Sequence, residues 1–117
     1  MKIHNLVKEL NLTVYEEGAS LDREITGGYA SDLLSDVMGH ANQDNVWVTL
    51  QNHLNIIAVA SLKDLAGIVL VQGLEPAPEV LQRAREEGIT LLGTPLHTFE
   101  ICARIYLTLC QHEPGAR

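Results

Sequence analysis

Basic residues, aromatic residues and cysteine are all scarce in this chain. Its 117 residues hold eight Lys and Arg against fifteen Asp and Glu, together with one Trp, one Phe, three Tyr and two Cys. The net charge of -7 argues against nucleic acid and against an anionic membrane surface as partners, because binding either needs a basic face. With so few aromatic rings, the core has to be built from Leu, Ile, Val and Ala.

Long apolar runs are missing as well. No stretch approaches the roughly 18 apolar residues of a membrane-spanning helix, and residues 1–5 lack the apolar block of a signal peptide. Cys102 and Cys110 fall in a predicted helix, which separates them by about 12 Å along its axis, too far for a disulfide. We therefore expect ordinary thiols and a cytoplasmic protein.

Hydrophobic periodicity divides the chain into alternating helices and strands. Helices are predicted over residues 2–10, 31–41, 56–64 and 77–87, and from residue 95 onward. Strands are predicted over residues 12–15, 46–50, 68–71 and 89–92. Residues 56–60 are apolar throughout, so they fit a strand equally well. This alternation predicts one α/β domain over residues 1–112, with a sheet covered by helices on its faces and a flexible tail over 113–117.

The final predicted helix has an apolar side of its own. Helical spacing places five residues there, namely Leu96, Phe99, Ala103, Tyr106 and Cys110.

A charged pair and a glycine pair dominate residues 22–32. Paired glycines permit positive φ and a close approach to the backbone, and a Ser or Asp at a helix start can accept from its free N–H groups. Such a turn, with Ser31 capping the next helix, could hold a phosphate. Asp32 and Asp36 would oppose an anion unless a cation shared the site, so a purely structural corner is the alternative. The ligand-binding candidates in this stretch are Thr26, Gly27, Gly28, Tyr29, Ser31 and Asp32.

A second group of polar residues follows the predicted strands. It consists of Thr49, Gln51, Asn52 and His53 after one strand, and Thr94 after another. Ligands in α/β sheets usually bind beyond the carboxyl ends of strands, and amide side chains can bond a nucleobase or a sugar without carrying charge. The alternative is a solvated turn in which Asn55 caps the next helix.

Catalytic and metal-binding patterns are weak. His97 and Glu100 have a spacing that could contact one metal ion, but the sequence has no HxxxH or CxxC pattern, so we expect no metal and no cofactor. A hydrolase or phosphotransferase would need His53 or Asp32 within hydrogen-bond reach of Ser31 or Thr49. Without a nucleophile-elbow motif we expect no catalytic residues.

Asp22-Arg23 followed by Thr26-Gly27-Gly28 resembles the signature of the DRTGG domain family. Residues 29–38, 47–53 and 58–60 are similar to short stand-alone members of that family, and the resemblance spans about residues 5–110. It implies a three-layer α/β/α fold with a small central, mostly parallel sheet, similar to the N-terminal domain of HPr serine kinase/phosphorylase, and frequent dimerisation. The kinase part of that relative needs a Gly-x-x-x-x-Gly-Lys-Ser/Thr loop, which this sequence does not contain.

These observations favour a non-catalytic regulatory module that works as a homodimer and can bind a small, nucleotide-like ligand. The alternative is a ligand-free interaction domain that docks onto a metabolic or redox enzyme. A concave cavity lined by both polar stretches would favour sensing, whereas a flat apolar patch would favour docking.

Overall fold

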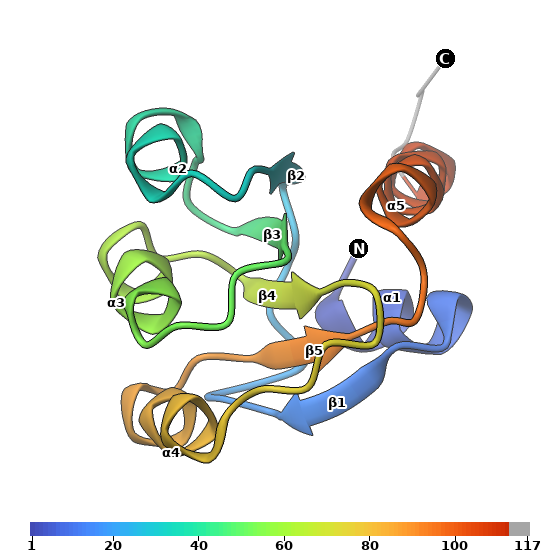
Figure 1. Ribbon diagram of the computed structural model, residues 1–117. Coiled ribbons are helices and arrows are strands. Elements are labelled where there is room, and N and C mark those ends of the chain that lie inside the picture. Colours follow the sequence, from blue (N-terminus) through green and yellow to red (C-terminus); the bar gives the residue numbers. More distant parts are fainter. Residues whose placement is uncertain (113–117) are drawn as a thin grey trace.

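The computed structural model describes residues 1–112, and Figure 1 shows their arrangement. In chain order the elements are α1 (Ile3–Leu10), β1 (Thr13–Glu16), β2 (Gly27–Ala30), α2 (Leu34–His40), β3 (Asn45–Thr49), α3 (Asn55–Leu62), β4 (Gly67–Leu70), α4 (Pro78–Glu87), β5 (Leu91–Gly93) and α5 (Thr98–His112). The predicted tail over 113–117 lies outside the described residues. Within residues 1–112 no helix is long and apolar enough to span a membrane.

The five strands form one sheet in the order β1-β5-β4-β3-β2. Strands β2, β3, β4 and β5 are parallel to their neighbours, and β1 pairs antiparallel with β5. The predicted small, mostly parallel sheet is therefore confirmed.

The order of the strands decides where the helices lie. From β2 to β5 the chain always moves to the next strand in the same direction, and parallel crossovers are almost always right-handed. The helices α2, α3 and α4 must therefore share one face of the sheet. The helices α1 and α5 cover the other face, as Figure 1 shows, which confirms the three-layer fold.

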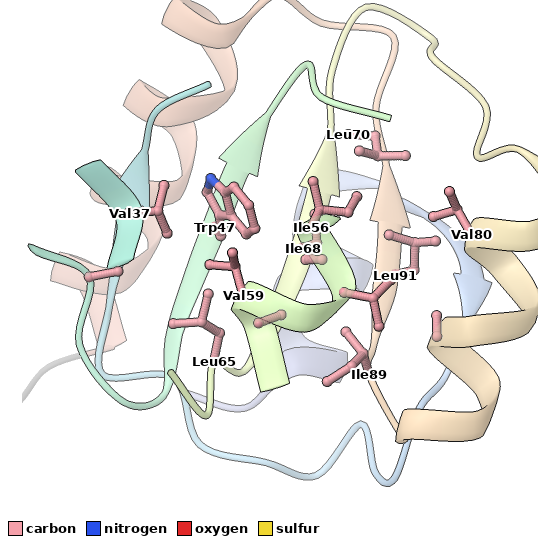
Figure 2. Packing of buried hydrophobic residues seen from close by; sticks show 14 residues of the cluster. Val37, Trp47, Ile56, Val59, Leu65, Ile68, Leu70, Val80, Ile89 and Leu91 are labelled. Atoms are coloured by element: carbon pink, nitrogen blue, oxygen red, sulfur yellow. The ribbon is translucent and has the colours of Figure 1, made fainter. Parts of the chain in front are cut away.

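Each face of the sheet has its own apolar core. Under α2, α3 and α4 the core surrounds Trp47, Ile56 and Leu91 (Figure 2), and on the other face it includes Leu6 and Ile101. Every residue of β3 and β4 is buried, as expected for parallel strands covered on both sides. The apolar run in residues 56–60 is helical, because α3 packs Ile56 against this core.

Three predicted helix starts are wrong. Leu54 is the N-cap of α3, and Asn55 is its first helical residue instead of its cap. The helix α2 begins at Leu34, and Ser31 Oγ accepts from the Leu33 N–H at 3.1 Å in the turn before it. The last helix begins at Thr98, while Thr94 Oγ1 accepts from the Leu96 N–H at 3.2 Å. In the last two cases the hydroxyl stabilises a turn directly after a strand, and the helix begins a few residues further along the chain.

The largest difference from prediction lies at the glycine pair. Gly27 and Gly28 belong to β2, paired in parallel with Asn45 and Val46 of β3, and neither has a positive φ. The predicted anion-binding turn is therefore wrong in its geometry. Pairing with a buried neighbouring strand gives this segment its extended conformation, although its own sequence lacks the apolar residues of an ordinary strand.

Candidate functional site

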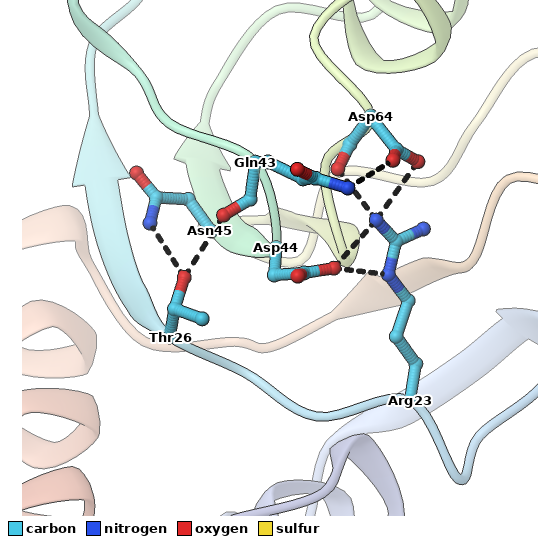
Figure 3. A network of polar contacts seen from close by, with 6 residues as sticks. All are labelled: Arg23, Thr26, Gln43, Asp44, Asn45 and Asp64. Atoms are coloured by element: carbon cyan, nitrogen blue, oxygen red, sulfur yellow. Dashed lines mark hydrogen bonds and ion pairs between the residues drawn. The ribbon is translucent and has the colours of Figure 1, made fainter.

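Arg23, from the Asp22-Arg23 pair of the motif, lies at the amino-terminal end of the parallel strands, where it meets two carboxylates. Arg23 Nη2 lies 2.7 Å from Asp44 Oδ1 and 2.9 Å from Asp64 Oδ1. Its guanidinium also donates to the backbone carbonyl of Asp64, and Gln43 Nε2 donates to Asp64 Oδ2 at 2.7 Å. Figure 3 shows that this network joins the segment before β2 to the loops that lead into β3 and β4.

The electrostatics agree with a structural clamp. Desolvation is the largest single influence on Arg23 and lowers its pKa, but the hydrogen bonds and charges of Asp44 and Asp64 together raise that pKa above its ordinary value. The hydrogen bond and the charge of Arg23 in turn lower the pKa of Asp64. Both charges of the pair are therefore stabilised by the fold itself.

Thr26 and Gly27 fit closely against β3. Thr26 Oγ1 donates to the Gln43 carbonyl at 2.9 Å and accepts from Asn45 Nδ2 at 3.4 Å. A Cβ at Gly27 would lie 3.3 Å from the same Asn45 nitrogen, closer than side chains ordinarily pack. The motif thus sets the position of β2 beside β3.

At the carboxyl-terminal end of the parallel strands, Asp32 joins two loops. Its Oδ1 accepts from Thr49 Oγ1 and from the Leu50 N–H, both at 2.8 Å, and its backbone carbonyl accepts from Gln51 Nε2 at 2.9 Å. The contact between Asp32 and Thr49 is one that a hydrolase would require. Thr49 is only 1% exposed, however, so no substrate reaches its hydroxyl, and the contact serves to brace the loops.

The other polar candidates at this edge also bond within the protein. Asn52 Nδ2 donates to the Glu75 carbonyl at 2.8 Å, and Asn52 Oδ1 accepts from the Ala77 N–H at 3.2 Å. His53 Nδ1 accepts from the Asn55 N–H. In residues 1–112 no buried side-chain nitrogen or oxygen lacks a partner, and no group of three or more His, Cys, Asp or Glu residues could hold a metal ion.

The strand order does not predict a crevice at this end of the strands either. Doubly wound sheets bind ligands where the strand order reverses, because neighbouring loops diverge there. Here the order of β2 to β5 never reverses. The two polar stretches predicted as ligand sites are therefore brought near each other through Asp32.

A hollow of about 270 Å³ instead opens between β2 and α5, and we call it the α5–β2 hollow. Its lining consists of Gly28, Tyr29, Ala30, Val46, Val48, Cys102, Ile105, Tyr106 and Leu109. Gly28 and Ala30 leave this space because they are small, and the residues of α5 form the facing wall. Burial raises the pKa of the Cys102 thiol, so this side chain presents an uncharged group to the hollow.

The hollow borders the free edge of the sheet. The Ser31 N–H donates to the Val48 carbonyl, and alternate residues of a strand turn their N–H and C=O groups to the same side. The backbone groups of Tyr29 therefore face β3, whereas Gly28 and Ala30 turn their backbone groups outward, where no further strand lies in the described chain.

The side chain of Tyr29 lies on the face of the sheet that α2 covers. There Tyr29 Oη donates to Asp36, and this hydrogen bond raises the pKa of Tyr29 and lowers that of Asp36.

Sequence reasoning identified Gly28 and Tyr29 but missed the rest of the hollow. The alternation of Gly28 and Ala30 is the one local signal, since two small residues on one face of a strand leave space above the sheet. Residues 102–109 gave no such signal, because which helix covers this face depends on the topology.

The fold is shared by a solved structure of known domain composition. It contains the CBS and DRTGG domains of the regulatory region of Clostridium perfringens pyrophosphatase, complexed with its activator diadenosine tetraphosphate. The TM-score is 0.66 at 15% sequence identity, and the match covers 89% of this chain and 45% of that chain. The present chain thus spans less than half of that relative.

Comparison at the level of sequence gives one family. No curated protein matches this chain, and the predicted likeness to the N-terminal domain of HPr serine kinase/phosphorylase stays a prediction. The DRTGG domain matches residues 5–108, which is nearly the whole of the described chain, and the protein belongs to the DRTGG domain family.

Proposed function

We propose that this chain is a non-catalytic regulatory domain that works as a homodimer and binds a small, nucleotide-like metabolite in the α5–β2 hollow. The hollow carries this proposal: at about 270 Å³ it is near the lower end of the sizes of small-molecule pockets, and it is lined in part by Gly28 and Tyr29 of the family motif region. The regulatory region of the Clostridium perfringens pyrophosphatase, which contains a DRTGG domain, is complexed with a dinucleotide activator, and this supports the same class of ligand here.

The chemistry of the hollow selects the base of such a ligand. Its lining contains no Lys and no Arg, and the chain carries a net charge of -7, so phosphate groups stay outside in solvent. An uncharged planar ring fits between the aliphatic floor of Val46 and Val48 and the aromatic side chain of Tyr106. The outward N–H and C=O groups of Gly28 and Ala30 supply a donor and an acceptor for the edge of the ring.

Binding is tested with adenosine, AMP and diadenosine tetraphosphate in thermal-shift and calorimetric titrations, with inorganic pyrophosphate as a control for the charge. Gly28→Leu fills the hollow, and a Cβ at this position meets Val46 at an ordinary 3.5 Å, so the strand accepts it. Ala58→Leu, on the exposed side of α3, is the matched control. We expect at least about tenfold weaker binding for Gly28→Leu only. No binding of any adenine compound at millimolar concentration contradicts the proposal, as does unchanged binding by Gly28→Leu.

The second candidate function is a ligand-free interaction domain that docks onto a metabolic or redox enzyme. Exposed apolar side chains favour it, because Phe99 is 87% exposed and Leu33 is 64% exposed. The hollow also lacks residues of the polar loop 49–53, which a sensing site lined by both stretches would have included. A domain of this kind would bind its enzyme with the same affinity in the presence and absence of nucleotides, whereas a sensor would not.

A further inference from the structure

The outward side of α5 carries a row of apolar residues, all of which are exposed in residues 1–112 except the half-buried Cys110. The row consists of Phe99, Ala103, Tyr106, Leu107 and Cys110, and we call it the α5 stripe. Phe99 is 87% exposed, Tyr106 59% and Leu107 60%. The opposite side of the helix buries Ile101, Ile105 and Thr108 against the sheet and α1. Folding of the monomer therefore accounts for one apolar side of α5 and leaves the other in water.

The spacing of the stripe indicates a helix as its partner. Residues 99, 103, 106 and 110 follow one another at intervals of four, three and four, which is the a/d seam of two packed helices. Large and small side chains alternate along this seam, in the order Phe, Ala, Tyr and Cys. Two such seams fit together only in an arrangement that sets large residues against small ones.

We propose that the α5 stripe packs antiparallel against the α5 stripe of a second copy, about a two-fold axis that passes between residues 103 and 106. This interface rests on the proposed homodimer and specifies its geometry. Antiparallel packing places each Tyr106 ring over Ala103 of the partner subunit and each Phe99 ring over Cys110 of the partner subunit. Parallel packing would instead place Tyr against Tyr and Ala against Ala, with a clash at one layer and a gap at the next.

Charge and area both fit a second copy as the occupant. Copies that each carry a net charge of -7 repel one another, but Glu100 and Arg104 are the only acidic and basic residues of α5 besides His112, and they cancel. The four rings of the dimer bury about 600 Å² in total, half of the roughly 1,200 Å² that a specific interface needs. Leu107, Ala103 and the aliphatic parts of the charged side chains supply the remainder.

This arrangement also links the dimer to the α5–β2 hollow, because Tyr106 belongs to both. A ligand in the hollow contacts one edge of the ring, while the partner subunit covers the other. Any preference of the ligand for one orientation of Tyr106 therefore changes the dimerisation constant, and dimerisation changes the affinity for the ligand by the same factor.

Complementary size changes test the interface by sedimentation velocity and native mass spectrometry of the full chain, whose monomer mass is 12.9 kDa. Ala103→Tyr sets Tyr against Tyr, and Tyr106→Ala sets Ala against Ala, so each variant alone should dimerise at least about 100-fold more weakly. An equal mixture of the two should form a heterodimer, because every layer again pairs a large side chain with a small one. Leu62→Ser, at a 74% exposed residue on the other helical layer, should dimerise like the wild type.

Several results would overturn this interface: a wild-type monomer at 200 μM chain concentration, single variants that dimerise like the wild type, or a mixture that stays monomeric. Oxidative cross-linking of wild type through Cys110 would also overturn it, because antiparallel pairing keeps these thiols about 16 Å apart along the axis. Phe99→Asp changes an almost fully exposed residue, so this variant must also fold, as judged by circular dichroism, and sediment as a monomer.

Ligand titrations on the same samples separate this inference from the proposed function. A monomer that still binds adenine compounds through the hollow leaves ligand sensing intact and removes the interface. A dimer with the expected size pattern that binds none of them removes ligand sensing and retains the interface.

Discussion

Replacing Arg23 with Ala should destabilise the domain by about 2 kcal/mol. Exposed ion pairs contribute only about 0.2–1 kcal/mol, and hydrogen bonds to charged groups contribute about 1.5–3 kcal/mol where solvent is excluded. The side chains of Arg23 and Asp44 are each 31% exposed, so we assign their pair a contribution to stability of about 1.5 kcal/mol, the lower end of that range. Asp64 is 57% exposed, and solvent screening reduces its share to about 0.5 kcal/mol.

The predicted loss is large enough to measure by thermal unfolding. An unfolding entropy of about 2.1 cal/mol/K per residue converts 1 kcal/mol into about 4 °C for a chain of this length, so Tm should fall by about 8 °C. Arg83→Ala is the matched control, because its ion pair with Glu86 is a 3.6 Å contact on the surface of α4. This control should change Tm by less than about 2 °C.

The effect should also depend on pH with a definite sign. Arg23 lowers the pKa of Asp64 in the folded state, below the value of 3.8 of a free Asp. The stabilisation from this pair is therefore fully present above pH 3.8 and is lost as the pH falls through the lower folded-state pKa. The gap in Tm between wild type and Arg23→Ala should shrink below about pH 4. A variant that melts within 1 °C of wild type at pH 7 would refute the assignment of Arg23 as a clamp.

Two further changes probe the loops that hold the sheet. Gly18 and Gly73 share a positive φ of about 70°, but a Cβ at Gly18 would lie 2.6 Å from the backbone nitrogen of Thr90, whereas Gly73 has open space around it. Gly73→Ala should therefore cost about 1 kcal/mol of unfolding free energy in urea titrations, and Gly18→Ala at least twice as much, so equal costs would contradict the packing of that loop. Asp32→Ala leaves the buried Thr49 hydroxyl without its acceptor and should cost about 1–3 kcal/mol in the same titrations, with Ser35→Ala, on the exposed side of α2, as the control. A loss below about 0.3 kcal/mol would show that Asp32 does not brace the two loops.

Much of the fold was predictable because its signals are local. Residues 46–50 are apolar except for Thr49 and residues 68–71 are all apolar, as expected for buried parallel strands, and Pro78 and Gly88 stand at the first turn and the end of α4. The strand β2 was missed for the opposite reason. Its four residues carry two glycines and no aliphatic alternation, so only its pairing with β3 makes it a strand.

The candidate site was predictable only in part. Gly28 and Tyr29 were among the residues expected to bind a ligand, and both line the α5–β2 hollow. The polar residues 49–53 were favoured by their place after a buried strand, but Thr49, Gln51 and Asn52 bond to neighbouring loops. A polar side chain can either remain free to bind a ligand or form a hydrogen bond with another loop. Which of the two occurs depends on partners such as Glu75, which are distant in the sequence.

The sequence by itself determined the α/β class, most of the helices and the family signature, because periodicity, turn residues and motifs are properties of neighbouring positions. It also showed the apolar spacing of Phe99, Ala103 and Tyr106. Only the tertiary structure decided that this row faces solvent, because the sheet has a single place for α5 and fills it with Ile101 and Ile105. Likewise, Arg23 reaches Asp44 and Asp64 only because β2, β3 and β4 are parallel neighbours, so that all three strands begin at the same end of the sheet.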